Sequence, residues 1–417
     1  MQHPPHDTGY ECKTLVLMGL GFGLVGLDRW MIAPLFPHIM KDLGLDYQQL
    51  GTLIGVLSLT WGAWSILMGR LSDSIGRKRI LVTTMVAFSL LSGLSGLASG
   101  FASLMLIRAV MGVAEGAFTP ASIAATGEAS LPARRGFNQG LQLSMFSLLG
   151  LGFAPIIATQ LLQVLPSWHW VFMVSALPGL VVAVLIARTL RSDAPVVRTS
   201  AAPAPRWSTL FRSRNVVVAM LAVLCAMAGI FVISAMVPIY LEHVLKLSTL
   251  EMGFIVSAIG FGGFAGAFGL SALSDRVGRK PVAISAFIGS AVLLYVFAHT
   301  GANPQMLFIL LFGLSVCALG LLGLLSGPIA TEAAPAGLIA SSVGFVSGAG
   351  EIFGGGLAPV LAGYVAQHQG LHATLYVALG GFVCGAVVSL FLLETAPCRQ
   401  QRGGLPAEGG LPSTSSP

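Results

Sequence analysis

Long apolar runs, each about as long as a lipid bilayer is thick, alternate with short polar segments along the whole chain. A helix of roughly 20 apolar residues spans a hydrocarbon core of roughly 30 Å. Because backbone groups inside lipid must be hydrogen-bonded within their own segment, we expect these runs to be α-helical. The pattern predicts twelve membrane-spanning helices, near residues 14–37, 50–69, 80–99, 102–126, 138–163, 169–189, 215–240, 251–272, 281–300, 304–330, 338–366 and 373–393.

The composition supports a membrane protein. Hydrophobic residues make up 55% of the 417 residues and charged residues only 9%, whereas soluble domains carry roughly 25% charged residues. The first apolar run is longer than the core of a signal peptide and contains Asp28 and Arg29, so we expect it to be retained in the mature chain. The fold class predicted is an all-α membrane protein.

The positions of the basic residues predict how the chain is oriented. Most of the 22 Lys and Arg residues lie in loops on one side of the predicted helices, with Lys41 and Lys246 on the other side and Arg29 and Arg108 within helices. Basic loops remain in the cytoplasm, so we expect both termini there and a multi-pass protein of a bacterial inner membrane. This bias also explains the net charge of +6 without a nucleic-acid partner.

Two related halves are expected. The motif at 69–79 recurs at 272–280, and the stretch at 125–133 recurs at 330–336. Two repeats at nearly one spacing indicate a duplicated six-helix unit, as in many secondary transporters. The predicted organisation is a six-helix bundle, a Pro- and Arg-rich cytoplasmic linker, a second bundle in pseudo-symmetric arrangement, and a disordered tail, over residues 1–189, 190–214, 215–394 and 395–417.

Several classes of activity find no support in the sequence. It contains no phosphate-binding loop, no metal-ligand spacing and no nucleophile paired with a base, so we expect neither an enzyme nor a nucleotide-driven pump. The five cysteines are scattered and read as free thiols. We expect no cofactor, no metal and no protein partner, that is, a monomer in the lipid bilayer.

The few ionisable residues inside predicted helices are the candidate functional residues. Each costs roughly 2.5–3.5 kcal/mol to insert, so each calls for a role. Asp28 and Arg29 lie in the first helix, and Arg108 and Glu115 lie two turns apart on one face of the fourth. One interpretation is a pair of structural ion pairs. The other is a proton relay beside an arginine that binds an organic anion through its planar fork.

In the second interpretation, an anion bound to the arginine weakens the electrostatic stabilisation that the arginine gives to the nearby ionised carboxylates. Proton uptake then becomes easier, and the two fluxes are coupled by reciprocal linkage. Glu351, in the glycine-rich 347–351 stretch, is a proton site, a substrate contact or a neutral packing residue. Gln142 either faces the cavity or bonds to a neighbouring helix. Arg29, Gln142 and Glu351 are the predicted substrate-binding residues.

The motif at 69–79 reads G-R-L-S-D-S-I-G-R-K-R and is similar to the signature of the major facilitator superfamily. The resemblance covers the whole helical part of the chain and implies two six-helix bundles that alternate access to a central site. It also implies that this loop and its repeat act as a conformational latch between the halves. The alternative is that the basic residues only mark topology. The predicted latch residues are Gly69, Asp73, Gly76, Arg77, Asp275, Gly278 and Arg279.

A narrower resemblance rests on three segments. Leu27-Asp28-Arg29, the M-K-D-L-G-L stretch at 40–45 and the R-A-V-M-G-V-A-E-G stretch at 108–116 look like the anion:cation symporter branch. The resemblance implies that Arg29 contacts an organic anion, that Asp28 and Glu115 carry protons, and that Arg108 tunes them. An Asp-Arg pair in the first helix also resembles the spinster-like lysolipid transporters.

The predicted function is proton-coupled uptake of a small organic anion by alternating access. Sugar acids, aromatic acids, dicarboxylates and sulfonates would all suit one arginine in a mostly apolar cavity. The alternative function is proton-driven efflux of a drug-like or lipid-like amphiphile.

Overall fold

The computed structural model describes residues 7–131, 135–191, 207–334 and 339–396, and these residues form helices and no strands. The first half contains α1 (Thr8–Trp30) followed by α2 (Ile32–Leu43), α3 (Tyr47–Ile75), α4 (Arg77–Ser95), α5 (Phe101–Ala129), α6 (Arg135–Met145) continued by η1 (Phe146–Phe153) and α7 (Ala154–Val164), and α8 (Trp168–Thr189).

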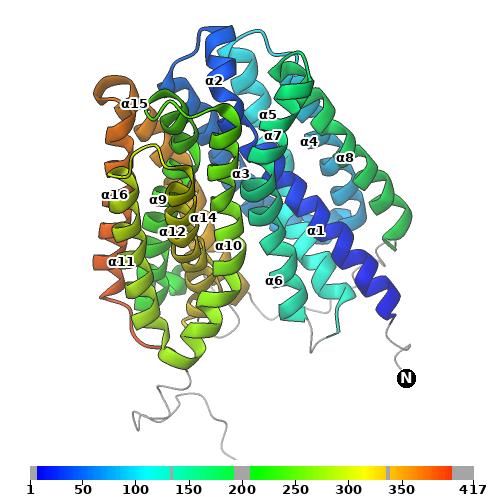
Figure 1. The fold of residues 1–417 in the computed structure, drawn as a ribbon. Coiled ribbons are helices and arrows are strands. Elements are labelled where there is room, and N and C mark those ends of the chain that lie inside the picture. The colour runs from blue at the N-terminus through cyan, green and yellow to red at the C-terminus, as the bar shows by residue number, and fades with distance from the viewer. Residues whose placement is uncertain (1–6, 132–134, 192–206, 335–338, 397–417) are drawn as a thin grey trace, which may run out of the picture.

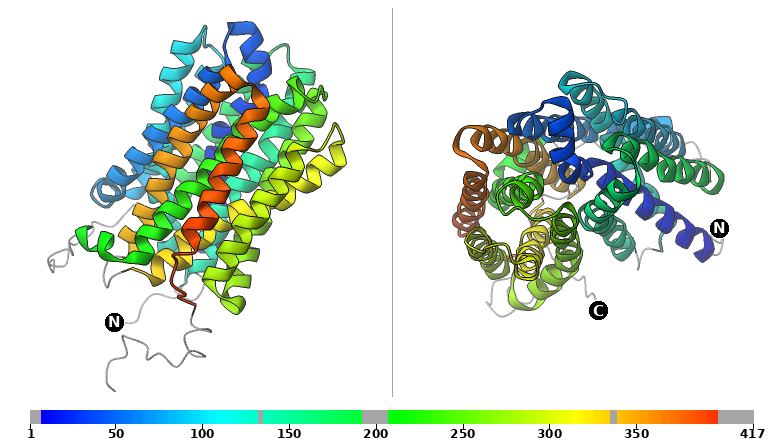
Figure 2. Two further views of the ribbon diagram at one scale, coloured as in Figure 1. Left: turned by 90° about the vertical axis from the view of Figure 1, so that its left-hand side faces the viewer. Right: turned by 45° about the horizontal axis from the view of Figure 1, so that its top comes forward.

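The second half repeats this order. A short 3₁₀-helix, η2 (Trp207–Arg212), leads into α9 (Arg214–His243), α10 (Thr249–Val277), α11 (Arg279–Ala298), α12 (Pro304–Leu324) continued by η3 (Leu325–Ile329) and α13 (Ala330–Glu332), α14 (Ile339–Ala349) continued by η4 (Gly350–Leu357) and α15 (Ala358–Gln369), and α16 (Leu371–Ser389). Figures 1 and 2 show the resulting array of long, roughly parallel rods.

These helices form twelve rods whose ends lie within six residues of the ends of the twelve predicted segments. Among the described residues, eleven rods are long and apolar enough to cross a membrane, and α3, with 29 residues, completes the set. The prediction of an all-α membrane protein with two pseudo-symmetric six-helix bundles is confirmed. The predicted tail from 397 onward and most of the predicted linker (192–206) lie outside the described residues.

The two ends of the molecule can be told apart by the chain reversals. After an even number of crossings, α16 ends at the end where α1 begins, which we call the terminal face (Figure 1). The loop glycines Gly76 and Gly278, with φ of 98° and 120°, lie at this face. Gly44, with φ of 63°, ends α2 at the other end, the opposite face. Positive φ suits glycine, because it has no Cβ to clash with the backbone.

The most extensive contacts between the two halves lie along two pairs of rods. α3 packs against the rod α14–η4–α15, and α10 packs against the rod α6–η1–α7. The approach is so close that a Cβ added at Gly51 would lie 2.2 Å from Pro359 O, and one added at Gly260 would lie 1.8 Å from Gly152 N. Small residues therefore set the spacing between the bundles, as expected for helices packed in lipid.

The fifth rod of each half contains a π-helical stretch at an equivalent place, η1 in the first half and η4 in the second. Both stretches lie where the halves meet. Each is rich in glycine, with Gly150 and Gly152 in η1 and four glycines in η4. π-Helical turns interrupt the regular hydrogen-bond ladder and occur often at functional sites.

Candidate functional site

Five buried ionisable residues gather deep inside the bundle, and no more than 5% of any of them is exposed. Asp28 and Arg29 come from α1, Arg108 and Glu115 from α5, and Glu351 from η4. The other four residues all lie close enough to act electrostatically on Glu115. The sequence predicted all five, and the structure brings them together at the boundary between the two halves.

Arg29 forms the link between the halves. Its Nη2 donates to Glu351 Oε2 at 2.8 Å and to Ser58 Oγ at 2.6 Å. Glu351 lies 322 residues away in the other half, so this ion pair exists only through the fold. Ser58 was missed by the sequence reasoning, because a hydroxyl in an apolar helix carries no distinguishing signal.

Four aromatic rings surround the Arg29 guanidinium. Its Cζ lies 4.9 Å from the ring centroid of Phe231, 5.5 Å from Trp61 and 5.9 Å from both Trp30 and Phe146. Cation–π attraction stabilises a cation in such surroundings. These rings come from α1, α3, η1 and α9, and they line both halves of the boundary.

Several buried polar atoms around Arg29 have no hydrogen-bond partner among the described residues. They are Arg29 Nε and Nη1 and the indole nitrogens of Trp30 and Trp61. All are donors, and a buried donor left without an acceptor costs roughly 1–3 kcal/mol. The arginine and its aromatic surroundings therefore offer unused donors that suit a carboxylate.

Asp28 and Arg108 do not form the simple ion pairs of the first interpretation. The Asp28 carboxylate accepts from Ser92 Oγ at 2.9 Å, and Ser92 in turn lies 2.8 Å from Ser175 Oγ. Arg108 Nη1 donates to two backbone carbonyls, Asp28 O at 3.0 Å and Arg29 O at 3.3 Å. Arg108 thus holds the end of α1 in place and acts on Asp28 electrostatically.

Glu115 is the most isolated of the five. It is completely buried, and neither of its carboxylate oxygens has a hydrogen-bond partner among the described residues. An ionised carboxylate without donors is costly in a low-dielectric interior. The arrangement therefore suits a group whose charge changes during a working cycle.

Gln142 contributes a hydrogen bond within the first half. Its Nε2 donates to Ser122 Oγ at 2.8 Å, which links α6 to α5. Its Oε1 is buried without a partner in the described part of the chain. The residue lies four positions before Phe146, whose ring faces Arg29. The structure thus places Gln142 near the site but shows no contact between it and the charged cluster.

The predicted latch residues lie at the terminal face. The surroundings of Gly69 and the side chain of Asp73 lie outside the described part of the structure, so their latch roles stay predictions. Arg77, directly after Gly76, pairs with Glu128. Arg279, directly after Gly278, pairs with Asp275 at 2.6 Å and with Glu332 at 2.8 Å. These ion pairs lie within their own halves, so a latch between the halves stays a prediction.

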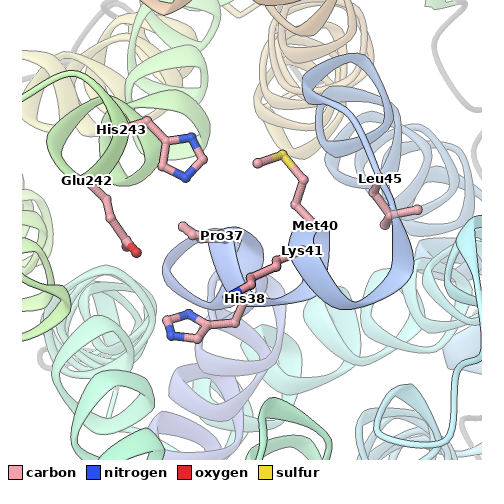
Figure 3. A pocket seen from close by; sticks show the side chains of 7 residues that line it. All are labelled: Pro37, His38, Met40, Lys41, Leu45, Glu242 and His243. Atoms are coloured by element: carbon pink, nitrogen blue, oxygen red, sulfur yellow. The ribbon is translucent and has the colours of Figure 1, made fainter. Parts of the chain in front are cut away.

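A separate pocket of about 600 Å³ opens at the opposite face. Figure 3 shows side chains of α9 on one side of the pocket and of α2 on the other, with Leu45 just beyond α2. The lining residues are Pro37, His38, Met40, Lys41, Leu45, Glu242 and His243. Next to it, Tyr47 and His243 are hydrogen-bonded at 3.0 Å across the halves. No group of three metal-ligating side chains occurs in the described ranges.

Comparison with known proteins agrees with this geometry. The family profile of the Major Facilitator Superfamily matches residues 18–350 and 219–410. A "Probable 4-methylmuconolactone transporter" of Cupriavidus pinatubonensis is 28% identical over 369 residues, covering 86% of this chain and 85% of the relative. The 3-(3-hydroxy-phenyl)propionate transporter of Escherichia coli is 29% identical over 298 residues, covering 69% of this chain and 71% of the relative.

Among solved structures, a bacterial homolog of the human lysosomal transporter Spinster, in an inward-facing and occupied conformation, superimposes with a TM-score of 0.73. It shares 16% sequence identity, and the match covers 94% of this chain and 97% of that one. At this identity the likeness concerns the fold. The profile match, the repeated halves and the twelve rods together lead to one conclusion: the chain belongs to the Major Facilitator Superfamily of membrane transporters.

Proposed function

We propose that this protein imports a small organic anion together with protons, by alternating access, across a bacterial inner membrane. The observation that carries the proposal is Arg29, a buried arginine at the boundary of the two halves with unused donors. In this proposal the terminal face lies in the cytoplasm, as the basic loops indicate.

The surroundings of Arg29 favour a carboxylate attached to an apolar or aromatic body. A guanidinium binds a carboxylate through parallel N–H···O bonds, while the four rings offer apolar surface around the rest of the molecule. Two of the relatives are named for such compounds, 4-methylmuconolactone and 3-(3-hydroxy-phenyl)propionate. Others are named for sialic acid and sulfoacetate, so the anionic group is the shared feature.

Proton coupling in this proposal follows from the electrostatic neighbours of Glu115. Arg29 and Arg108 both act on its charge. An anion bound to Arg29 cancels part of the positive field at Glu115, so the carboxylate gains affinity for a proton. Because linkage is reciprocal, a protonated site also binds the anion more tightly. Asp28, held by Ser92, is the second proposed proton carrier.

The test is uptake into proteoliposomes with an imposed proton gradient, using labelled galacturonate, 3-phenylpropionate, succinate and sulfoacetate. We expect one class to accumulate above the level in protein-free liposomes, and only with the gradient. Arg29→Ala should lower that uptake about a hundredfold, since the charged hydrogen bonds it removes are worth about 3 kcal/mol.

The matched control is Arg188→Ala, which removes an arginine from the last turn of α8, away from the buried cluster. This variant should transport like the parent. If an anion accumulates equally well in the Arg29→Ala variant, the anion site is not where we place it. An exporter of neutral or cationic amphiphiles would show that insensitivity.

A further inference from the structure

We infer that Glu351 is an internal carboxylate that occupies the anion site of Arg29 and must be displaced before a substrate can be held by both carboxylate oxygens. This inference rests on the proposed function and adds a residue to it. Glu351 would thereby set which anions bind and link their binding to the separation of the two halves.

The first step is the geometry of the guanidinium. Two neighbouring N–H groups can bind a carboxylate as a fork either along the Nε–Nη2 edge or along the Nη1–Nη2 edge, so each fork uses Nη2. Nη2 has two hydrogens, and Ser58 and Glu351 accept both, at 2.6 and 2.8 Å. The nitrogens that remain without a partner, Nε and Nη1, belong to different edges. A substrate that binds as a fork must therefore displace one of the two acceptors.

The second step decides which acceptor leaves. If Ser58 left, the substrate carboxylate would lie directly beside the Glu351 carboxylate. Two like charges at about 4 Å repel each other by several kcal/mol even at a moderate dielectric constant. If Glu351 leaves, Ser58 stays as a neutral neighbour and the substrate replaces one negative charge with another. Displacement of Glu351 is the favoured exchange.

The third step concerns where Glu351 lies once it is free. The carboxylate packs tightly against the backbone at Gly355, where an added Cβ would lie 3.0 Å from Glu351 Oε2 and 2.9 Å from the Phe231 ring, so Glu351 has to move away from this wall as it leaves Arg29. In the described part of the packed elements, Glu351 faces Arg29 on α1, which also binds Ser58. Gly62 on α3 and Phe231 on α9 lie beside it, and Glu115 on α5 is in electrostatic range. Arg29 is the only cation among them. Displacement therefore leaves one more negative charge in the buried cluster, which is costly unless a proton enters the cluster with the anion.

The consequence is mechanical as well as chemical. The bond between Arg29 and Glu351 joins α1 of the first half to η4 of the second. Its replacement by a substrate carboxylate removes a direct tie between the halves. Neutral analogues of the substrate cannot replace a carboxylate at this arginine and are excluded.

The experiment measures binding of acetate, 3-phenylpropionate, succinate, galacturonate and sulfoacetate to purified full-length protein, by calorimetry, at several pH values. We expect Glu351→Gln to bind the best of these anions about tenfold more tightly, because a neutral amide competes less well for Arg29. Glu351→Asp keeps the charge but reaches less far, so its affinity should lie in between.

Glu251→Gln is the matched control, because it removes one carboxylate at the exposed start of α10, where glutamine can also complete the capping box. It should behave like the parent. Equal or weaker binding in Glu351→Gln overturns the inference and leaves the proposed function standing. If none of the anions binds the parent or either variant, both fall. Should Glu351→Gln not fold, unchanged binding in Glu351→Asp overturns the inference, and tighter binding supports it.

Discussion

At the scale of single residues, the two proposed proton carriers have very different surroundings. The Asp28 carboxylate has a hydroxyl donor from Ser92 and the field of Arg108. Glu115 has no hydrogen-bond donor in the described part of the chain and depends on the electrostatic field of its neighbours. Glu115 should therefore respond more strongly than Asp28 to an anion arriving at Arg29.

This difference predicts separable effects on transport. Glu115→Gln should keep anion counterflow, which needs no net proton movement, while accumulation driven by a proton gradient is lost. Asp28→Asn should lower accumulation less, because its serine partner can still be satisfied by an amide. Both rates are measured in the same proteoliposomes, with and without the gradient. Accumulation that survives in both variants would rule out the proton relay.

The sequence predicted the charged residues of the site but not its neutral ones. A charge in an apolar helix is conspicuous because it is costly there, so Asp28, Arg29, Arg108, Glu115 and Glu351 could all be found. Ser58, Trp61 and Phe231 carry no such cost in a membrane helix. Their place beside Arg29 depends on how α3 and α9 pack, which a single sequence does not encode in any local pattern.

At the scale of helices, the close approach of the two halves depends on glycines at which an added Cβ would clash with the facing backbone. Gly260 on α10 meets the backbone of Gly152 in η1, and Gly51 on α3 meets Pro359 in the second half. Helix positions were predictable from apolar length. The π-helical turns η1 and η4 were not, because a glycine-rich stretch in lipid is equally compatible with a regular helix.

Gly260→Ala should therefore shift the protein away from the arrangement seen here. The added Cβ would lie 1.8 Å from Gly152 N, so α10 and η1 must separate. Overpacking of this kind typically costs about 1–3 kcal/mol, which changes a two-state ratio by about five- to 150-fold. Distances between spin labels on α7 and α10 near the opposite face would report the shift.

The chain offers a matched control on the same helix. Gly269 is also in α10, but an added Cβ there has nothing within 4 Å. Gly269→Ala should leave the label distances and the transport rate as in the parent. Equal distances in both variants would mean that the helices adjust locally and that Gly260 does not control the approach of the halves.

At the scale of the whole molecule, duplication explains the scaffold but not the site. The rods, the loop glycines Gly76 and Gly278, and the π-helical stretches η1 and η4 repeat between the halves. The buried charged cluster does not, since Asp28, Arg29, Arg108 and Glu115 lie in the first half and, of these five residues, Glu351 lies in the second. Such an asymmetry suits a substrate site held mainly by one half and released by a change at the other.

The repeated ion pairs at the terminal face allow the coupling free energies of equivalent pairs in the two halves to be compared. Arg77–Glu128 and Arg279–Glu332 occupy equivalent places, and the two sequence repeats supply the two partners of each pair. Their burial differs: 63% of the Glu128 side chain is exposed, against 24% for Glu332. Solvent screens an exposed pair, so we expect a coupling below about 1 kcal/mol for Arg77–Glu128 and about 2 kcal/mol for Arg279–Glu332.

Double-mutant cycles with Arg→Gln and Glu→Gln at each pair, read out as unfolding free energy, measure both couplings. Asp275 also binds Arg279, so the cycle at the second pair should be repeated in an Asp275→Asn background, where the remaining coupling should rise. The larger coupling in the second half would mean that the half with fewer buried charges is the stiffer one at this face. Equal couplings would mean that burial does not distinguish the pairs, and that the duplicated loops stabilise both halves alike.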